Sequence, residues 1–155
     1  MTHEELNEVL RKHKLWLDDK EGGELANMQH ANMQYADMRG TNLRNANMQH
    51  ANMQDVNLQD ADMRGADMRD ADMRDADIDY SAWPLWCGSL KAHVDDRIAI
   101  QLLYHTLSVV QHSPYVSDEL KRVLLTEPVV DIANRFHRVD ECGKLETYKE
   151  EEEND

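Results

Sequence analysis

Hydrophobic positions recur every five residues through the middle of the chain, a spacing that neither a helix nor a flat strand explains. Residues 26–80 read as eleven unbroken pentads, beginning ANMQH, ANMQY, ADMRG. In a helix a five-residue step rotates the side chain by about 140°, and in a strand an odd step alternates between the two faces. The chain must therefore turn once per pentad, so that each pentad points the same residues inward.

The five positions of the repeat have distinct residue types. Position one is Ala in nine of eleven pentads, with Thr41 and Val56 as the exceptions; position two is always Asn or Asp, and position three is Met, Leu or Ile. We expect positions one and three to point inward and position two to bond to nearby backbone amides at the turns. If the chain turns by about a right angle after each pentad, four pentads close a square coil, and coils stack about 4.8 Å apart. The methionine stripe is then core packing rather than a metal or redox site.

This pattern resembles the pentapeptide-repeat family, whose consensus is A(D/N)LXX. The resemblance covers residues 26–80, with Met largely replacing the family's usual Leu or Phe. It implies a mainly β fold, a right-handed quadrilateral β-helix (pentapeptide-repeat solenoid), with an N-terminal α-helical cap and a C-terminal α-helical part.

The flanking segments have helical rather than five-residue spacing. Residues 2–17 begin with the capping-box pair Thr2 and Glu5 and predict an amphipathic helix over the first coil. Trp83 still falls on position three of a twelfth pentad, Pro84 ends the pattern, and Trp83 and Trp86 are expected to seal the last coil. The predicted divisions are a capping helix and turn at 1–25, the solenoid at 26–85, a helical domain at 86–145 and an acidic disordered tail at 146–155.

Three helices are predicted in the C-terminal part. They run from about residue 95 to 112, from a Ser117 cap to near 125, and from the Thr126-Glu127-Pro128 start to about 139. In some pentapeptide-repeat proteins such an element pairs two chains, so the resemblance implies a homodimer through the C-terminal helices.

Composition restricts the partners. The formal net charge of −14 opposes direct binding to nucleic acid or an anionic membrane. No apolar run could span a membrane and no signal-like start is present, so a soluble cytoplasmic protein is expected. Two cysteines make a disulfide framework improbable.

No motif for enzyme catalysis is apparent, and no cofactor is expected. The chain has no phosphate loop, no Gly-rich dinucleotide turn and no serine elbow. The segment FHRVDECG brings His137 and Cys142 close in sequence, and with Cys87 and either His93 or His105 they could complete a tetrahedral zinc site. The spacing matches no standard zinc pattern, and a free Cys is usually a small buried hydrophobe.

Acidic residues are concentrated in the second half of the repeats. Residues 26–54 hold one acid against two arginines, whereas residues 55–80 hold nine Asp against three arginines, giving net charges of +1 and −6. On a square coil we expect these acids to form rows along several faces, with Asp62, Asp67, Asp72 and Asp77 beside one another and Asp55, Asp60, Asp70 and Asp75 at the corners. They are Asp55, Asp60, Asp62, Asp67, Asp70, Asp72, Asp75, Asp77 and Asp79.

The resemblance gives this charge a function, since several family members resemble B-form DNA and inhibit or protect DNA-binding enzymes. It implies a non-enzymatic protein-interaction module, from a phage or a bacterium, that mimics DNA toward a type II topoisomerase or nuclease. Four charges per coil would crudely match the charge spacing of DNA, although under three coils span only about 13 Å. The alternatives are a general protein-binding adaptor or scaffold whose charge gives only solubility, and an enzyme or metal-dependent regulator.

Overall fold

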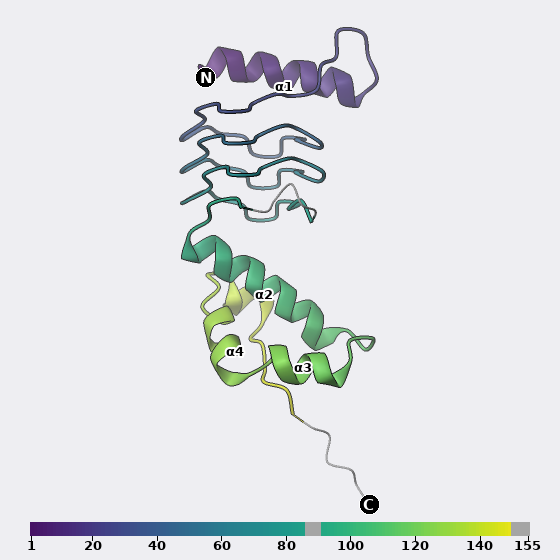
Figure 1. The fold of residues 1–155 in the computed structure, drawn as a ribbon, viewed down its shortest axis with the longest axis vertical. Coiled ribbons are helices and arrows are strands. Elements are labelled where there is room, and N and C mark those ends of the chain that lie inside the picture. The colour runs from purple at the N-terminus through teal and green to yellow at the C-terminus, as the bar shows by residue number, and fades with distance from the viewer. Residues whose placement is uncertain (86–90, 150–155) are drawn as a thin grey trace, which may run out of the picture. The chain divides into compact units, whose positions relative to one another are not determined.

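The computed structural model describes residues 1–85 and 91–149. The chain divides into two compact units, Met1–Asp95 and Asp96–Asp155. The first contains helix α1 (His3–Leu17) and the repeats, and the second contains α2 (Asp96–His112), α3 (Asp118–Leu124), α4 (Glu127–Ala133) and α5 (Val139–Cys142) (Figure 1). None of the helices in the described ranges is long and apolar enough to cross a membrane.

The repeats form stacked coils with a period of twenty residues. Parallel bridges join residues in position two of successive coils, such as Asn27 with Asn47 and Asn47 with Asp67. Four pentads therefore make one coil, as the sequence predicts, and the coils stack beneath α1 in Figure 1. Within the described repeats each bridge is isolated, so the continuous strands expected of a β-helix do not form. The reason is that positions four and five of every pentad are used to turn the chain.

Position five lies at the corner, as predicted for its acids, and makes the turn with a left-handed backbone that the pentad pattern does not specify. Its φ is positive in all eleven pentads, and the N–H of the next residue donates to the carbonyl of position three, as from Ala31 to Met28 at 3.0 Å. A positive φ at the third residue of a turn is the feature of a type II turn and favours Gly or Asn. The sequence feature that indicates this turn type is the occurrence of Gly and Asn at position five, at Gly40, Asn45 and Gly65.

Position two supports the turn through its side chain, as predicted. In every pentad its Oδ1 accepts a hydrogen bond from the backbone N–H of position four, for example from Gln29 to Asn27 at 3.2 Å and from Arg69 to Asp67 at 3.3 Å. Asn and Asp share this oxygen, which explains why only these two types occur at position two.

The interior confirms that the methionine stripe is core. Every position-three side chain from Met28 to Ile78 is buried. Flexible Met side chains fill the channel, and small residues at position one leave room for them. The fully buried set comprises Met28, Met38, Leu43, Met48, Met53, Leu58, Met63, Met68 and Met73.

The solenoid continues beyond the point where the sequence pattern breaks. Asp62 bridges Ala82, and Asp72 bridges His93, one residue later than the regular spacing. The solenoid therefore extends past Pro84 and past the predicted boundary at residue 85, because the backbone ladder does not require the repeat consensus. Trp83 is half-buried, whereas Trp86 lies outside the described residues.

The helices of the second unit enclose a separate core. Side chains from α2, α4 and the segments around them meet there, and the Tyr104 and Phe136 rings stack with centroids 4.7 Å apart. Ser117 caps α3 as predicted. The third predicted helix was too long, since α4 ends at Ala133 and α5 starts at Val139. Asn134 follows α4 and instead binds both the N–H and the carbonyl of Leu145 through its side chain.

The start of the predicted disordered tail is also corrected. The N–H of Glu146 donates to Gln111 Oε1 at 2.7 Å, and the N–H of Tyr148 donates to the Leu125 carbonyl at 3.0 Å. Residues 146–149 therefore pack on the helices, because their backbone groups find partners there. The rest of the predicted tail, residues 150–155, lies outside the described residues.

Candidate protein-interaction surface

The acidic residues of position two lie around a coil rather than along it. Neighbours along the axis are twenty residues apart, so Asp62, Asp67, Asp72 and Asp77 occupy four successive sides. Each of them bridges an Asn of the preceding coil, from Asn42 to Asn57. The expectation that these four acids lie beside one another in a row is therefore wrong, because a five-residue step moves to the next side of the square.

Arginines at position four neutralise three of these acids. In pentads 61–65, 66–70 and 71–75 the arginine guanidinium donates hydrogen bonds through both Nε and Nη2 to the carboxylate two residues earlier. The Nη2–Oδ2 distance is 2.6 Å in each pair. We call these pairs the arginine clamps: Asp62–Arg64, Asp67–Arg69 and Asp72–Arg74. A fourth pair, Asp37–Arg39, has the same form at 2.7 Å.

The clamps lower the pKa of each of the three Asp carboxyls. Hydrogen bonds from Arg69, together with one from Gln49, lower the pKa of Asp67 from 3.8 to about 2, although partial burial opposes the change. The clamps with Arg64 and Arg74 likewise lower the pKa of Asp62 and of Asp72. These carboxylates stay ionised but have little charge left for a partner.

Glutamine side chains extend this network along the axis. Gln29 donates to Gln49 at 3.3 Å, and Gln49 donates to Asp67. Gln34 donates to Gln54, which donates to Asp72, at 2.7 and 3.0 Å. Two sides of the solenoid are therefore occupied by polar ladders that satisfy their own groups.

The remaining acids apart from Asp70 gather on one side, around pentads 36–40, 56–60 and 76–80. We call this surface the acidic face and define it by Asp55, Asp60, Asp75 and Asp77. Asp55 and Asp75 share the corner leading into this side, and Asp60 lies at its far corner; all three are exposed. In the described part of the chain no arginine or lysine pairs with any of the four carboxylates, while Asp77 accepts a hydrogen bond from Gln59 at 2.7 Å. Asp79 lies in the same pentad, and its N–H donates to Asp77 Oδ1.

Two tyrosines border the acidic face. Tyr35 lies one coil from Asp55 at the same corner, and Tyr80 lies one coil from Asp60. Their exposed fractions are 74% and 69%, and both have positive φ, which is unusual for a bulky residue. Exposed aromatic side chains are common anchors in protein interfaces. Neither residue stands out in the sequence, because both occupy the variable position five of their pentads.

The ninth acid, Asp70, lies at a different corner. Its Oδ2 is 3.9 Å from Nδ1 of His50. His30 stacks on His50, with ring centroids 4.8 Å apart and 5° between the planes. The two histidines are twenty residues apart, so the period of the coil places one above the other.

The zinc hypothesis is not supported by a described cluster of ligands. No group of three His, Cys, Asp or Glu side chains in residues 1–85 and 91–149 could hold a metal ion. Cys142 is an exposed free thiol, and the ring of His137 meets that of Phe136 edge-on. Cys87 lies outside the described residues, so the four-ligand site stays a prediction.

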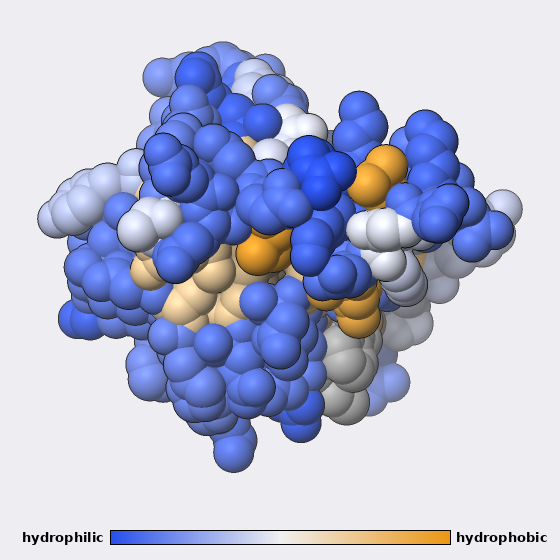
Figure 2. All heavy atoms as spheres, turned by 90° about the horizontal axis from the view of Figure 1, so that it is seen from above, coloured by the Kyte–Doolittle hydropathy of each residue, from blue (hydrophilic) through white to orange (hydrophobic). Residues whose placement is uncertain are grey.

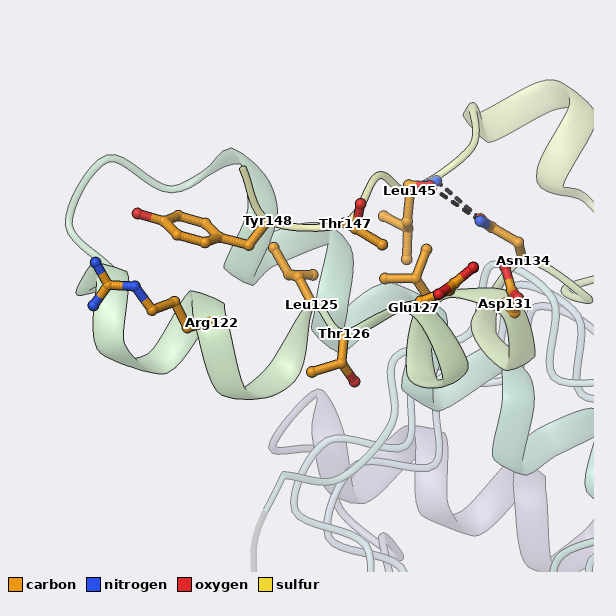
Figure 3. Close-up of a pocket in the computed structure, with 10 residues that line it drawn as sticks. Arg122, Leu125, Thr126, Glu127, Asp131, Asn134, Leu145, Thr147 and Tyr148 are labelled. Carbon is orange, nitrogen blue, oxygen red and sulfur yellow. Dashed lines mark hydrogen bonds between the residues drawn. The ribbon is translucent and has the colours of Figure 1, made fainter. Parts of the chain in front are cut away.

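The helical unit contains an open groove of about 770 Å³ between the α3–α4 region and the C-terminal segment. Figure 3 shows Arg122 and Tyr148 at one end and Asn134 bonded to the backbone of Leu145 at the other. The Arg122 guanidinium lies 5.7 Å from the centre of the Tyr148 ring. Asn134 and Leu145 bind one another, as do Arg122 and Tyr148, and the groove itself indicates no particular ligand.

Comparison with known proteins agrees with the period of the coils. Residues 24–60 and 51–81 match the family described as pentapeptide repeats, with eight copies. The stacked coils and this match define a repeat-solenoid protein, and the chain contains a pentapeptide-repeat domain. The family match suggests a protein-interaction or structural module.

Two solved structures are similar to parts of the chain. The pentapeptide repeat protein Rfr23 from the cyanobacterium Cyanothece 51142 is 20% identical, with a TM-score of 0.36, over 47% of this chain and 49% of that chain. The present chain thus matches about half the length of Rfr23. The protein alr5209 from Nostoc Pcc 7120, also a pentapeptide repeat protein, is 12% identical, with a TM-score of 0.22, over 56% of this chain and 95% of that one. No significant match was found among curated proteins.

Proposed function

We propose that this protein acts by binding another protein, and that its acidic face competes with duplex DNA for the basic site of a DNA-binding enzyme, such as a type II topoisomerase or a nuclease. The proposal takes the fold to be the right-handed quadrilateral β-helix of the pentapeptide-repeat family. The observation that carries it is the sidedness of the charge. Three sides of the last full coil carry clamped acids, whereas Asp55, Asp60, Asp75 and Asp77 carry no clamp.

The spacing of these charges suits a basic surface. Asp55 and Asp75 lie on adjacent coils, about 4.8 Å apart along the axis, and Asp60 adds a charge at the next corner. A basic groove adapted to phosphates would gain from such a row in both association rate and specificity. The acidic face is shorter than a typical DNA footprint, since duplex DNA carries one charge per about 1.7 Å.

A homodimer through the helical unit would extend the surface, and we propose one. Large hydrophobic side chains are exposed on this unit: Val109, Tyr115, Leu120, Val123 and Ile132. A second copy would cover such side chains. Light scattering of the purified chain should give twice the monomer mass, and Val123→Glu should reduce it; a monomeric mass for the unmodified chain at tens of micromolar would contradict dimerisation.

A general adaptor is the second candidate function. It is favoured by the two exposed tyrosines, whose contribution to binding would not depend on salt. In that case the acids give solubility alone, and the partner need not bind DNA.

Two variants with the same net charge separate these functions. In the first, Asp55, Asp60 and Asp75 become Asn, which removes three unclamped charges at position five, where Asn45 already occurs. In the second, Asp62, Asp67 and Asp72 become Asn, which removes three clamped charges at position two, where Asn also occurs. Each variant gains three units of charge.

The assay is retention of partners from a bacterial lysate, with and without excess duplex DNA and at two salt concentrations. For DNA mimicry, DNA should displace the retained enzyme, and the first variant should lose most binding while the second keeps it. Equal retention by the unmodified chain and both variants, unaffected by DNA or salt, would reject mimicry and favour the adaptor.

A further inference from the structure

Helix α1 covers only part of the first coil. In later coils the N–H of position two donates to the preceding coil, as from Asn47 to the Ala26 carbonyl at 2.9 Å, but the first coil has no coil before it. Ala31 and Ala36 are partly exposed, whereas their counterparts in the next coil are buried. Seen from the α1 end, the surface is mostly hydrophilic, with moderately hydrophobic atoms visible in a central hollow (Figure 2). The cap is held by separate contacts with the first coil, such as the hydrogen bond from the Met1 ammonium to the Asn32 carbonyl at 3.1 Å.

His13 makes one of these contacts. It is completely buried between α1 and the first coil, and its Nδ1 accepts a hydrogen bond from the N–H of Ala26 at 3.2 Å. A nitrogen that accepts this bond carries no proton, so the neutral ring must hold its proton on Nε2. Nε2 is buried and has no hydrogen-bond partner. The ring is therefore held in one tautomer by the hydrogen bond from Ala26, by the neighbouring backbone of Arg44, and by packing that includes the Trp16 ring at 5.7 Å.

Protonation of the His13 ring would turn its hydrogen bond with Ala26 into an unfavourable contact. The imidazolium carries a proton on both nitrogens, so Nδ1–H would face the N–H of Ala26, donor against donor. The new charge would also lie in a site without water. We propose that His13 is a proton-sensitive latch, and that protonation of its ring releases α1 from the first coil.

No charged group around His13 would stabilise the imidazolium. Its neighbours on α1 are the cations Lys12 and Lys14, and the Lys12 ammonium pairs with Glu24 at 2.8 Å. The first coil contributes only backbone groups, at Ala26 and Arg44. Burial lowers the pKa of His13 below its usual value, and the Arg44 backbone opposes this more weakly.

The direction of the pH dependence follows from this lowered pKa. The free ring of an open cap titrates near 6.5, whereas the closed ring titrates lower, so the open state binds more protons in the interval between the two values. Closure is complete above about pH 6.5 and weakens as the pH falls below it. Each pH unit lowers the closed-to-open ratio by up to about tenfold until the closed ring itself titrates.

The test is amide hydrogen exchange of the full chain between pH 8 and pH 5, corrected for intrinsic rates. We expect α1 and the Ala26 amide to lose protection on acidification, while the amides of coils two and three keep theirs. Unchanged α1 protection across this range would overturn the proposal.

Two variants make the test specific. In His13→Gln a side-chain oxygen can still accept from Ala26 but cannot become charged, so α1 protection should no longer depend on pH. His3→Gln is the matched control, because His3 is an exposed histidine in the first turn of the same helix, and it should leave the dependence intact. The opposite pattern, with dependence kept in His13→Gln or lost in His3→Gln, would assign the effect to another group.

If His13→Gln does not fold, an NMR titration of the unmodified chain decides, since a His13 pKa at or above 6.5 would refute the latch.

Discussion

The clamp at Asp67 gives the sharpest stability prediction. In Asp67→Asn the Oδ1 atom remains and can still accept from the Arg69 backbone, as Asn does in pentad 46–50. What is lost is the charged contact with the Arg69 guanidinium, whose Nη2 lies 2.6 Å from Oδ2, together with the hydrogen bond that Oδ2 accepts from Gln49 Nε2. The substitution therefore separates the contacts of Oδ2 from the turn.

The shifted pKa sets the size of the effect. A carboxyl that titrates at about 2 instead of 3.8 contributes at most about 2 kcal/mol to the free energy of unfolding at neutral pH. The Arg69 side chain is 52% exposed, and solvent screening reduces this figure to about 1 kcal/mol. Because the folded pKa is lowered, the contribution is complete above about pH 4 and is lost as the pH falls toward 2. At pH 3 it should be roughly halved.

The assay is urea unfolding, followed by circular dichroism at pH 7, 4 and 3. Asp67→Asn should lose about 1 kcal/mol at pH 7 and visibly less at pH 3. The control is Asp55→Asn, which removes an exposed acid with no clamp and should change stability by less than about 0.5 kcal/mol. A loss that is the same at pH 7 and pH 3 would show that packing, rather than charge, accounts for it.

Three further substitutions test the fold. Met53→Ala opens a cavity at a fully buried position and should cost about 2 to 5 kcal/mol in urea unfolding; a loss below about 1 kcal/mol would mean that the channel collapses around it. In Gly23→Ala the new Cβ would lie 2.4 Å from the Trp16 backbone nitrogen, so α1 should lose protection in amide exchange, whereas Gly22→Asn, which has open space around its Cβ and a residue type that tolerates the φ of 76°, should leave α1 in place. Tyr35→Asn relieves a positive φ of 61° and should raise the melting temperature, corresponding to about 1 kcal/mol; a lower melting temperature would show that the exposed ring packs favourably.

The sequence was sufficient for the architecture of the coils because each inward position is restricted to few residue types. Ala at position one and Met at position three predict the channel, and Asn or Asp at position two predicts the side-chain bond to the turn. The capping box at Thr2 and Glu5 was equally visible, and both of its hydrogen bonds form. Each of these features depends on residues that are close together in the sequence, so the residue types alone predict it.

The distribution of charge could not be predicted in the same way. The twenty-residue coil places Asp62 beside Asn42 rather than beside Asp67, and only the stacked geometry shows it. The Asp67–Arg69 clamp depends on two side chains reaching around one turn, a contact that the spacing permits but does not require. The end of α4 was missed for a similar reason, since Asn134 finds its partner eleven residues away in sequence.

Removing the clamp arginines gives a variant that is expected to bind a basic partner more tightly. Gln already occupies position four in pentads of the first two coils, so Arg64, Arg69 and Arg74 can be changed to Gln with the backbone pattern kept. The change removes three positive charges and exposes the carboxylates of Asp62, Asp67 and Asp72 on the other sides of the coil.

If a basic partner recognises carboxylate density, this variant should bind it more tightly at low salt, and its affinity should fall more steeply as salt rises. If recognition requires the particular side formed by Asp55, Asp60 and Asp75, affinity should stay within about twofold, since the new charges point elsewhere. Weaker binding by a variant that remains folded would contradict both forms of the electrostatic model, because added negative charge cannot repel a basic site.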